Sequence, residues 1–125
     1  MIIGTGIDIV EVARLRKIIA GKSGTRFIER VFTEEERRFC LARKDPAPHL
    51  AARFAAKEAV FKALGTGWAR GASWLEAQVR RKGDEAPTLL LSGATLALGA
   101  AKGVGRIHLS LTHAGEWAAA TVILE

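Results

Sequence analysis

Four charged side chains stand inside otherwise apolar stretches, where a charge is costly unless it has a partner or a ligand. Asp8 lies in "GTGIDIV", and Lys57, Glu58 and Lys62 lie in "FAAKEAVFKALGTG" at residues 54–67. Carboxylates on a strand and on a buried helix can jointly hold magnesium, which commonly uses one or two protein carboxylates with water and phosphate oxygens. Lys62, one helical turn after Glu58, would then bind phosphate. The pattern predicts metal-assisted phosphoryl or phosphodiester chemistry, and spacing alone goes no further.

Simpler interpretations stand beside this one. Glu58 and Lys62 are spaced i, i+4 and would form a weak local ion pair on a semi-exposed stripe, although this helix has no polar face. Asp8 could end its strand or cap the following helix. Gly4 and Gly6 share the face of Asp8, and glycine in a strand often marks the close approach of a ligand or another backbone.

The helix that carries three of the charges is predicted to open at "DPAPHLAARF", run to about Leu64 and stop at the glycines Gly65 and Gly67. Apolar residues on every side of it indicate burial. A separate face of small residues would let another backbone approach closely or would pack subunits together: Ala55, Ala56, Ala59 and Ala63.

The remaining elements predict an α+β fold in one domain, residues 1–125, with a mostly antiparallel sheet packed on the long buried helix and shorter helices. "TEEER" is a capping box in which Thr33 caps a helix and Glu36 reaches back. Ser92 is expected to cap a short helix that ends near Gly103. Strands are predicted over 2–10, 73–81, 88–92, 106–113 and 117–124, and a first helix over 11–21.

Composition limits the functional class. The 125 residues are 49% hydrophobic and 26% charged, as in a soluble globular domain, and neither a membrane-spanning stretch nor a signal peptide is recognisable. The single cysteine, Cys40, excludes an internal disulfide and suits the cytoplasm. A net charge of +6 favours an acidic partner: nucleic acid, a phosphate-rich ligand or an acidic protein.

Three segments in this order, in a chain of this length, resemble the bacterial holo-[acyl-carrier-protein] synthases, the small single-domain type of 4′-phosphopantetheinyl transferase. They are "GIDIVEVARL", "RFAAKEAVFKALGTG" and "LSLTHAGEWAAATVIL", and "RVFTEEE" adds to the likeness. Segment 68–104 is less distinctive and contributes no functional residue. Thr112 stands where many relatives have serine, so a hydroxyl is retained.

The resemblance implies transfer of 4′-phosphopantetheine from coenzyme A to a serine of apo acyl carrier protein, with release of adenosine 3′,5′-bisphosphate. Asp8 and Glu58 match the magnesium ligands, and Lys62 matches the lysine at the pyrophosphate. Either carboxylate could accept the serine proton. The resemblance also implies a homotrimer with coenzyme A between neighbouring subunits.

Further residues are expected to contact the two substrates. Thr112 and His113 resemble positions at the nucleotide end of coenzyme A, and Lys44 and Arg53 are candidates for its 3′-phosphate, with ordinary solvated side chains as the alternative. Gly65 and Gly67 are helix stops first and a ligand-approach loop second. Arg14 and Lys17, opposite the apolar stripe of the first helix, are expected to dock the acidic carrier protein, or else to form a solvated face.

Two other functional classes compete with the enzyme. A small basic nucleic-acid-binding module is supported by the pI of about 10.1, but the chain has no tyrosine, few aromatics and no recognisable RNA- or DNA-reading motif. A structural subunit without chemistry would leave Asp8 and Glu58 without a purpose. The enzyme is therefore favoured, with no nucleic acid and no membrane among its partners.

Overall fold

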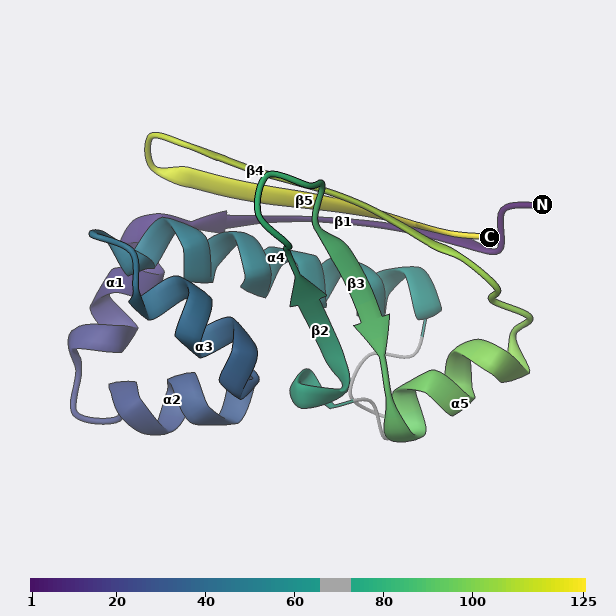
Figure 1. Cartoon of the computed structure of the whole chain (residues 1–125), viewed down its shortest axis with the longest axis horizontal. Coiled ribbons are helices and arrows are strands. Elements are labelled where there is room, and N and C mark those ends of the chain that lie inside the picture. Colours follow the sequence, from purple (N-terminus) through teal and green to yellow (C-terminus); the bar gives the residue numbers. More distant parts are fainter. Residues whose placement is uncertain (66–72) are drawn as a thin grey trace.

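A three-stranded antiparallel sheet forms one layer of the molecule (Figure 1). The computed structural model describes residues 1–65 and 73–125. The strand order is β1-β5-β4, with β1 (Gly4–Glu11), β4 (Ile107–Ala114) and β5 (Trp117–Leu124). Because side chains alternate along a strand, this register separates an inner face from an exposed outer face that carries Ile7 and Trp117.

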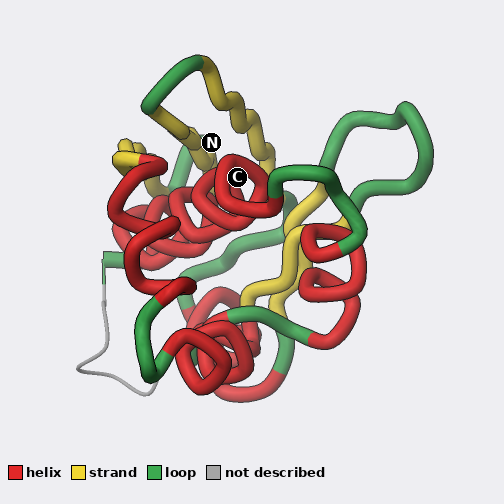
Figure 2. Tube along the Cα trace, turned by 90° about the vertical axis from the view of Figure 1, so that its left-hand side faces the viewer, coloured by secondary structure: helices red, strands yellow, loops and turns green. Residues whose placement is uncertain are grey.

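Helix α4 (Pro46–Leu64) crosses the inner face of this sheet and is the centre of the fold (Figures 1 and 2). Most of its residues are buried, as its apolar sequence predicts. A Cβ atom at Gly4 or Gly6 would collide with the carbonyl oxygens of Ala63 or Ala59. The close approach indicated by the glycines and the small-residue face is therefore that of α4 on its own strand β1.

Three short helices gather near the N-terminal end of α4: α1 (Val12–Ala20), α2 (Gly24–Val31) and α3 (Glu34–Leu41). Helices α1 and α3 pack on α4, and α2 packs on α1 and α3. The capping box at Thr33 is confirmed, with Glu36 N donating to Thr33 Oγ1 at 3.2 Å and Thr33 N donating to Glu36 Oε1 at 2.9 Å. Helix α2 was not predicted; Ser23 occupies its N-cap but makes no side-chain cap hydrogen bond.

A second, two-stranded sheet pairs β2 (Ala77–Arg80) with β3 (Thr88–Leu91), and the loop between them extends away from the body (Figure 2). Part of the strand predicted over 73–81 is instead a 3₁₀ turn at Trp74–Glu76. Ser92 occupies the N-cap of α5 (Gly93–Ala101) without a side-chain cap bond. Glu76 supplies the cap instead, its carboxylate accepting from Ala94 N and Thr95 N.

The architecture is α+β, as predicted, with the two sheets and the short helices arranged around α4 (Figure 1). No helix within residues 1–65 and 73–125 has the length and apolar character required to cross a bilayer.

Candidate active site

Asp8 and Lys62 meet where β1 runs beside α4. Lys62 Nζ lies 3.0 Å from Asp8 Oδ1 and donates a second hydrogen bond of 3.0 Å to the carbonyl oxygen of Ile7. Strand β1 continues past Asp8 to Glu11, so Asp8 neither ends the strand nor caps α1. The Asp8 side chain is 17% exposed and that of Lys62 is 54% exposed, so the pair borders solvent and a ligand can reach it.

Glu58 lies one turn before Lys62 on the same side of α4. Among the described residues its carboxylate has no hydrogen-bond or ion-pair partner, so the alternative of a local Glu58–Lys62 ion pair does not hold, and Lys62 pairs with Asp8. Burial and the neighbouring charge of Asp8 raise the pKa of Glu58, whereas Lys62 and Arg14 oppose the shift. Asp8 and Glu58 are thus close enough to repel each other, and a divalent cation would relieve that repulsion.

These two carboxylates suit magnesium better than a metal ion that is coordinated entirely by protein side chains. No cluster of three or more His, Cys, Asp or Glu residues suited to a metal occurs in the described part of the chain. Magnesium commonly takes one or two carboxylates and completes its octahedron with water and substrate phosphate. The donor set at Asp8 and Glu58 therefore fits this ion when a phosphate-bearing substrate is present.

Lys57, the neighbour of Glu58, has a different environment. Its side chain is completely buried, and Nζ donates to Trp74 O at 2.8 Å and to Ala77 O at 2.7 Å. Nζ also lies 2.8 Å from Oε1 of the equally buried Glu36. Burial lowers the pKa of Lys57, while Glu36 opposes the shift. This charge belongs to the core and is not available to a ligand.

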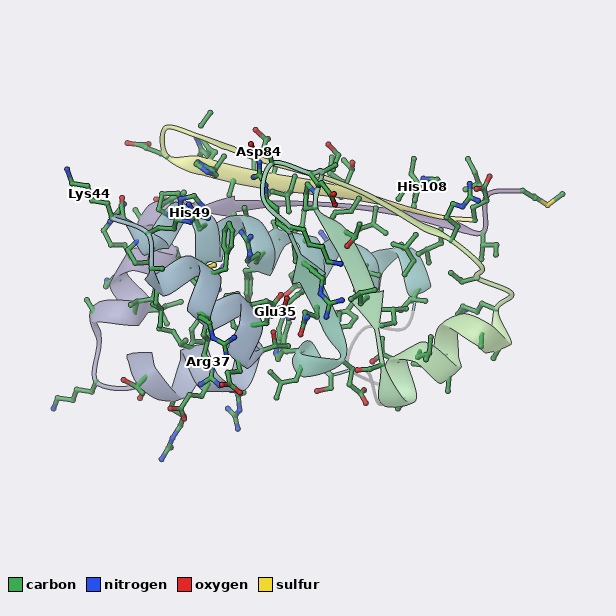
Figure 3. The ribbon with its side chains drawn as sticks, viewed as in Figure 1. Glu35, Arg37, Lys44, His49, Asp84 and His108 are labelled. Atoms are coloured by element: carbon green, nitrogen blue, oxygen red, sulfur yellow. The ribbon has the colours of Figure 1, made fainter. Side chains whose placement is uncertain are left out.

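Arg53 lies in the wall of a basic pocket of about 240 Å³, between α3, α4 and β2. Its guanidinium carbon is 4.1 Å from the centre of the Phe39 ring, and Nε has no hydrogen-bond partner within the described chain. Arg43, which the sequence does not single out, lies 4.1 Å from the same ring centre. Lys44 instead points away from the body (Figure 3). The structure thus brings Arg43, rather than Lys44, to the Phe39 ring beside Arg53.

His113 and Thr112 lie at the end of β4 on opposite faces of the sheet. His113 faces α4, with its ring 5.0 Å from that of His49, whereas Thr112 is on the outer face. Burial and His113 lower the pKa of His49. The sequence analysis assigns His49 no functional role, since a lone histidine near a helix start carries no distinguishing pattern. Thr112 and His113 of one subunit therefore do not face the same space.

The remaining predicted positions are the two glycines after α4 and two basic residues of α1. Gly65 has a φ of 72° and closes α4, its N–H donating to Phe61 O and Lys62 O, so its predicted role as a helix stop is confirmed. Gly67 lies outside the described residues. Arg14 and Lys17 are exposed on α1, and Arg14 is near enough to Glu58 to act on its pKa.

Comparison with known proteins gives one consistent answer. Residues 4–122 match the family model of the 4′-phosphopantetheinyl transferase superfamily. The holo-[acyl-carrier-protein] synthase of Syntrophotalea carbinolica is 50% identical over 123 residues, covering 98% of this chain and 94% of that protein.

Solved structures agree with the sequence match. The holo-[acyl-carrier-protein] synthase of Neisseria meningitidis has a TM-score of 0.90 at 32% identity, covering 100% of this chain and 99% of that one. The Bacillus anthracis enzyme, solved in complex with CoA (3′,5′-ADP), has a TM-score of 0.81 at 37% identity, covering 99% and 96%. Sequence and fold together establish that the chain belongs to the 4′-phosphopantetheinyl transferase superfamily.

Proposed function

We propose that the protein is a holo-[acyl-carrier-protein] synthase, which transfers 4′-phosphopantetheine from coenzyme A to a serine of apo acyl carrier protein. The observation that carries the proposal is the meeting of Asp8, Glu58 and Lys62 from β1 and α4 at a solvent-accessible edge. The names of the relatives and the bound CoA of the Bacillus anthracis enzyme support it. The same relatives favour the enzyme over a nucleic-acid-binding module.

In the proposed reaction the serine oxygen attacks the phosphorus that carries pantetheine, and the bond to the other phosphate of the pyrophosphate breaks. Asp8 and Glu58 would hold magnesium, which neutralises the charge that develops on the leaving adenosine 3′,5′-bisphosphate. Lys62 would donate to the phosphate oxygens in place of Asp8. Asp8 or Glu58 would accept the serine proton.

The nucleotide end of coenzyme A is assigned to the basic residues at the N-terminal half of α4. Arg53 is buried, and its Nε has no hydrogen-bond partner among the described residues. Its pocket is lined by Glu35, which pairs with Arg80, and by four arginines: Arg38, Arg53, Arg80 and Arg81. Lys44, Gly65, Gly67, Thr112 and His113 remain candidate contacts on the basis of the resemblance alone. Thr112 and His113 lie on opposite faces of the sheet, so they would not both contact a ligand held by a single subunit. One of them would contact coenzyme A that is bound between neighbouring subunits.

A homotrimer is proposed from the outer face of the three-stranded sheet. Ile7 is 65% exposed, Ile9 is 63% exposed and Trp117 is 50% exposed on this face, an apolar surface of the kind that other subunits cover. Arg14 and Lys17 of α1 are proposed to dock the carrier protein, since Arg14 lies near Glu58. A cytoplasmic location is proposed from the cysteine usage, with Cys40 reduced and buried.

The test is to incubate the protein with coenzyme A, magnesium and apo carrier protein, and to measure the intact mass of the carrier. A gain of one phosphopantetheine per carrier, abolished by a chelator, is the expected result. No mass gain across several carrier proteins would refute the proposed function.

A further inference from the structure

The buried pair Lys57–Glu36 joins four elements of the fold through hydrogen bonds that leave no donor of the ammonium group unused. Lys57 Nζ contacts Glu36 Oε1 of α3, the carbonyl of Trp74 in the 3₁₀ turn and the carbonyl of Ala77 in β2. Glu36 Oε2 in turn accepts from Val79 N at 2.9 Å. Each of these bonds is directional, so together they hold one face of α4 at a defined angle.

The opposite face of α4 has no such restraint. There the backbone of Ala59 and Ala63 lies against Gly6 and Gly4 of β1, a close contact in which no alanine side chain can hydrogen-bond. Within the described chain, the side-chain hydrogen bonds from α4 to other elements come from Lys57 and Lys62. Those of Lys62 lie inside the candidate site, where a phosphate would compete for them. Within the described residues, Lys57 therefore supplies the side-chain hydrogen bonds from α4 to other elements that remain when the site is occupied.

Glu58 depends on that restraint more than its neighbours do. Its carboxylate has no partner among the described residues, so its direction follows from the rotation of α4 about its own axis. A helix turns through about 100° per residue, which puts Glu58 on the flank between the Lys57 face and the Ala59 face. A small rotation of α4 would thus move Glu58 relative to Asp8.

We infer that the Lys57–Glu36 pair is a positioning device for the active site: it sets the rotation of α4 and so directs Glu58 and Lys62 toward Asp8. The inference rests on the proposed function for its effect on catalysis. A buried ion pair is weak grounds for stability alone, since well-packed apolar replacements are often as stable. Positioning explains why the charge is kept next to a metal-ligand candidate.

The test is the neutral double variant Glu36→Gln/Lys57→Met, in which both new side chains are close in volume to the originals. Its alanine methyl groups are labelled with carbon-13 and observed by NMR, with thermal unfolding measured on the same sample. The signals of Ala59 and Ala63, on the far side of α4, should shift or split. The kcat for transfer should fall by about 10²-fold, as for a misplacement of about 1 Å, with the KM for coenzyme A nearly unchanged.

Thr33→Ala is the matched control. It removes the hydroxyl that accepts from Glu36 N, and so weakens the start of α3 while leaving Lys57 and its partners in place. We expect a lower unfolding temperature with unchanged Ala59 and Ala63 methyl signals and unchanged kcat. A purely structural role for the buried pair would make the double variant behave like this control.

A folded double variant with wild-type Ala59 and Ala63 signals would overturn the inference, whatever its activity. If the double variant does not fold, Glu36→Gln alone decides: the inference predicts smaller shifts of the same methyl signals, and unmoved signals contradict it. A wild-type protein without transferase activity would refute the proposed function, while the methyl signals would still decide whether the pair sets the rotation of α4.

Discussion

Helix α4 carries two lysine–carboxylate pairs of nearly equal length in opposite environments. Lys57 and Glu36 are 2.8 Å apart and 0% exposed, whereas Lys62 and Asp8 are 3.0 Å apart with exposures of 54% and 17%. The first pair has its full set of partners, two of them backbone carbonyls that cannot leave. The second pair borders solvent and the carboxylate of Glu58, which has no partner among the described residues. Similar residue types thus form a permanent structural ion pair in one place and, in the other, an ion pair whose members can exchange partners with a ligand.

The comparison shows why distance alone does not identify a functional ion pair. A buried ion pair whose hydrogen-bond donors and acceptors are all occupied cannot bind a ligand, because no group is left to contact it. An open pair next to a like charge can gain from a ligand, since a cation or a phosphate would satisfy groups that the protein leaves unsatisfied.

The largest effect is expected from the open site. Asp8→Ala, Glu58→Ala and the shape-conserving Glu58→Gln should each lower the transfer rate by more than about 10³-fold, because several kcal/mol of metal-derived stabilisation is lost. Circular dichroism should show that all three variants remain folded, and extra magnesium should not restore full activity. Normal turnover by any one of them would remove that residue from the proposed metal site.

The next effect distinguishes the two lysines by stability. Lys57→Met should lower the free energy of unfolding by about 3–5 kcal/mol, because it leaves Glu36 buried without its counter-charge. Lys62→Met should lower it by less than about 1 kcal/mol, since the pair is partly exposed, yet should abolish most of the activity. Denaturant titration and transfer assays on both variants check this. Equal losses of unfolding free energy in Lys57→Met and Lys62→Met would contradict the distinction between a structural pair and an exchangeable pair.

A pH dependence should follow from the raised pKa of Glu58. A raised pKa means that the carboxylate takes up a proton at a higher pH than an ordinary glutamate, and protonation competes with a metal. Magnesium affinity measured by calorimetry should therefore decline as the pH falls, beginning above the ordinary value of 4.5. Arg14→Gln removes a charge that opposes the shift, so its decline should begin at higher pH. Identical profiles for the two proteins would contradict the electrostatic account.

The smallest effect is expected at the proposed carrier-docking surface. Arg14→Glu with Lys17→Glu should raise the KM for carrier protein several-fold while that for coenzyme A barely changes, because only the acidic partner meets this face of α1. Added salt should weaken the wild-type interaction by screening over a Debye length of about 8 Å. An unchanged carrier KM and salt response would place the docking surface elsewhere.

Local patterns account for most of what the sequence predicted correctly. The stop of α4 at Gly65, the capping box at Thr33 and the alternation of β4 all depend on neighbours in sequence. Asp8 was recognised as anomalous because a strand shows its two faces directly in the sequence. These features are short-range, so no tertiary information was needed.

The errors concern partners that are distant in sequence. Glu76 replaces Ser92 in capping α5, and Lys62 pairs with Asp8, where the simpler alternative had Glu58 as its partner. The sequence indicated that Lys57 needed a partner, but Glu36 was already explained by its capping box, and nothing local pointed to its second role. Long-range pairing of this kind follows from how helices pack and not from the pattern within any one of them.

The most direct test of the division between the two pairs is a crystal structure of the protein with coenzyme A and magnesium. We predict that Lys57 keeps Glu36, Trp74 O and Ala77 O as partners, while Lys62 leaves Asp8 for a phosphate oxygen and magnesium binds to Asp8 and Glu58. A complex in which Lys62 still pairs with Asp8, with the metal and the pyrophosphate bound elsewhere, would contradict the account.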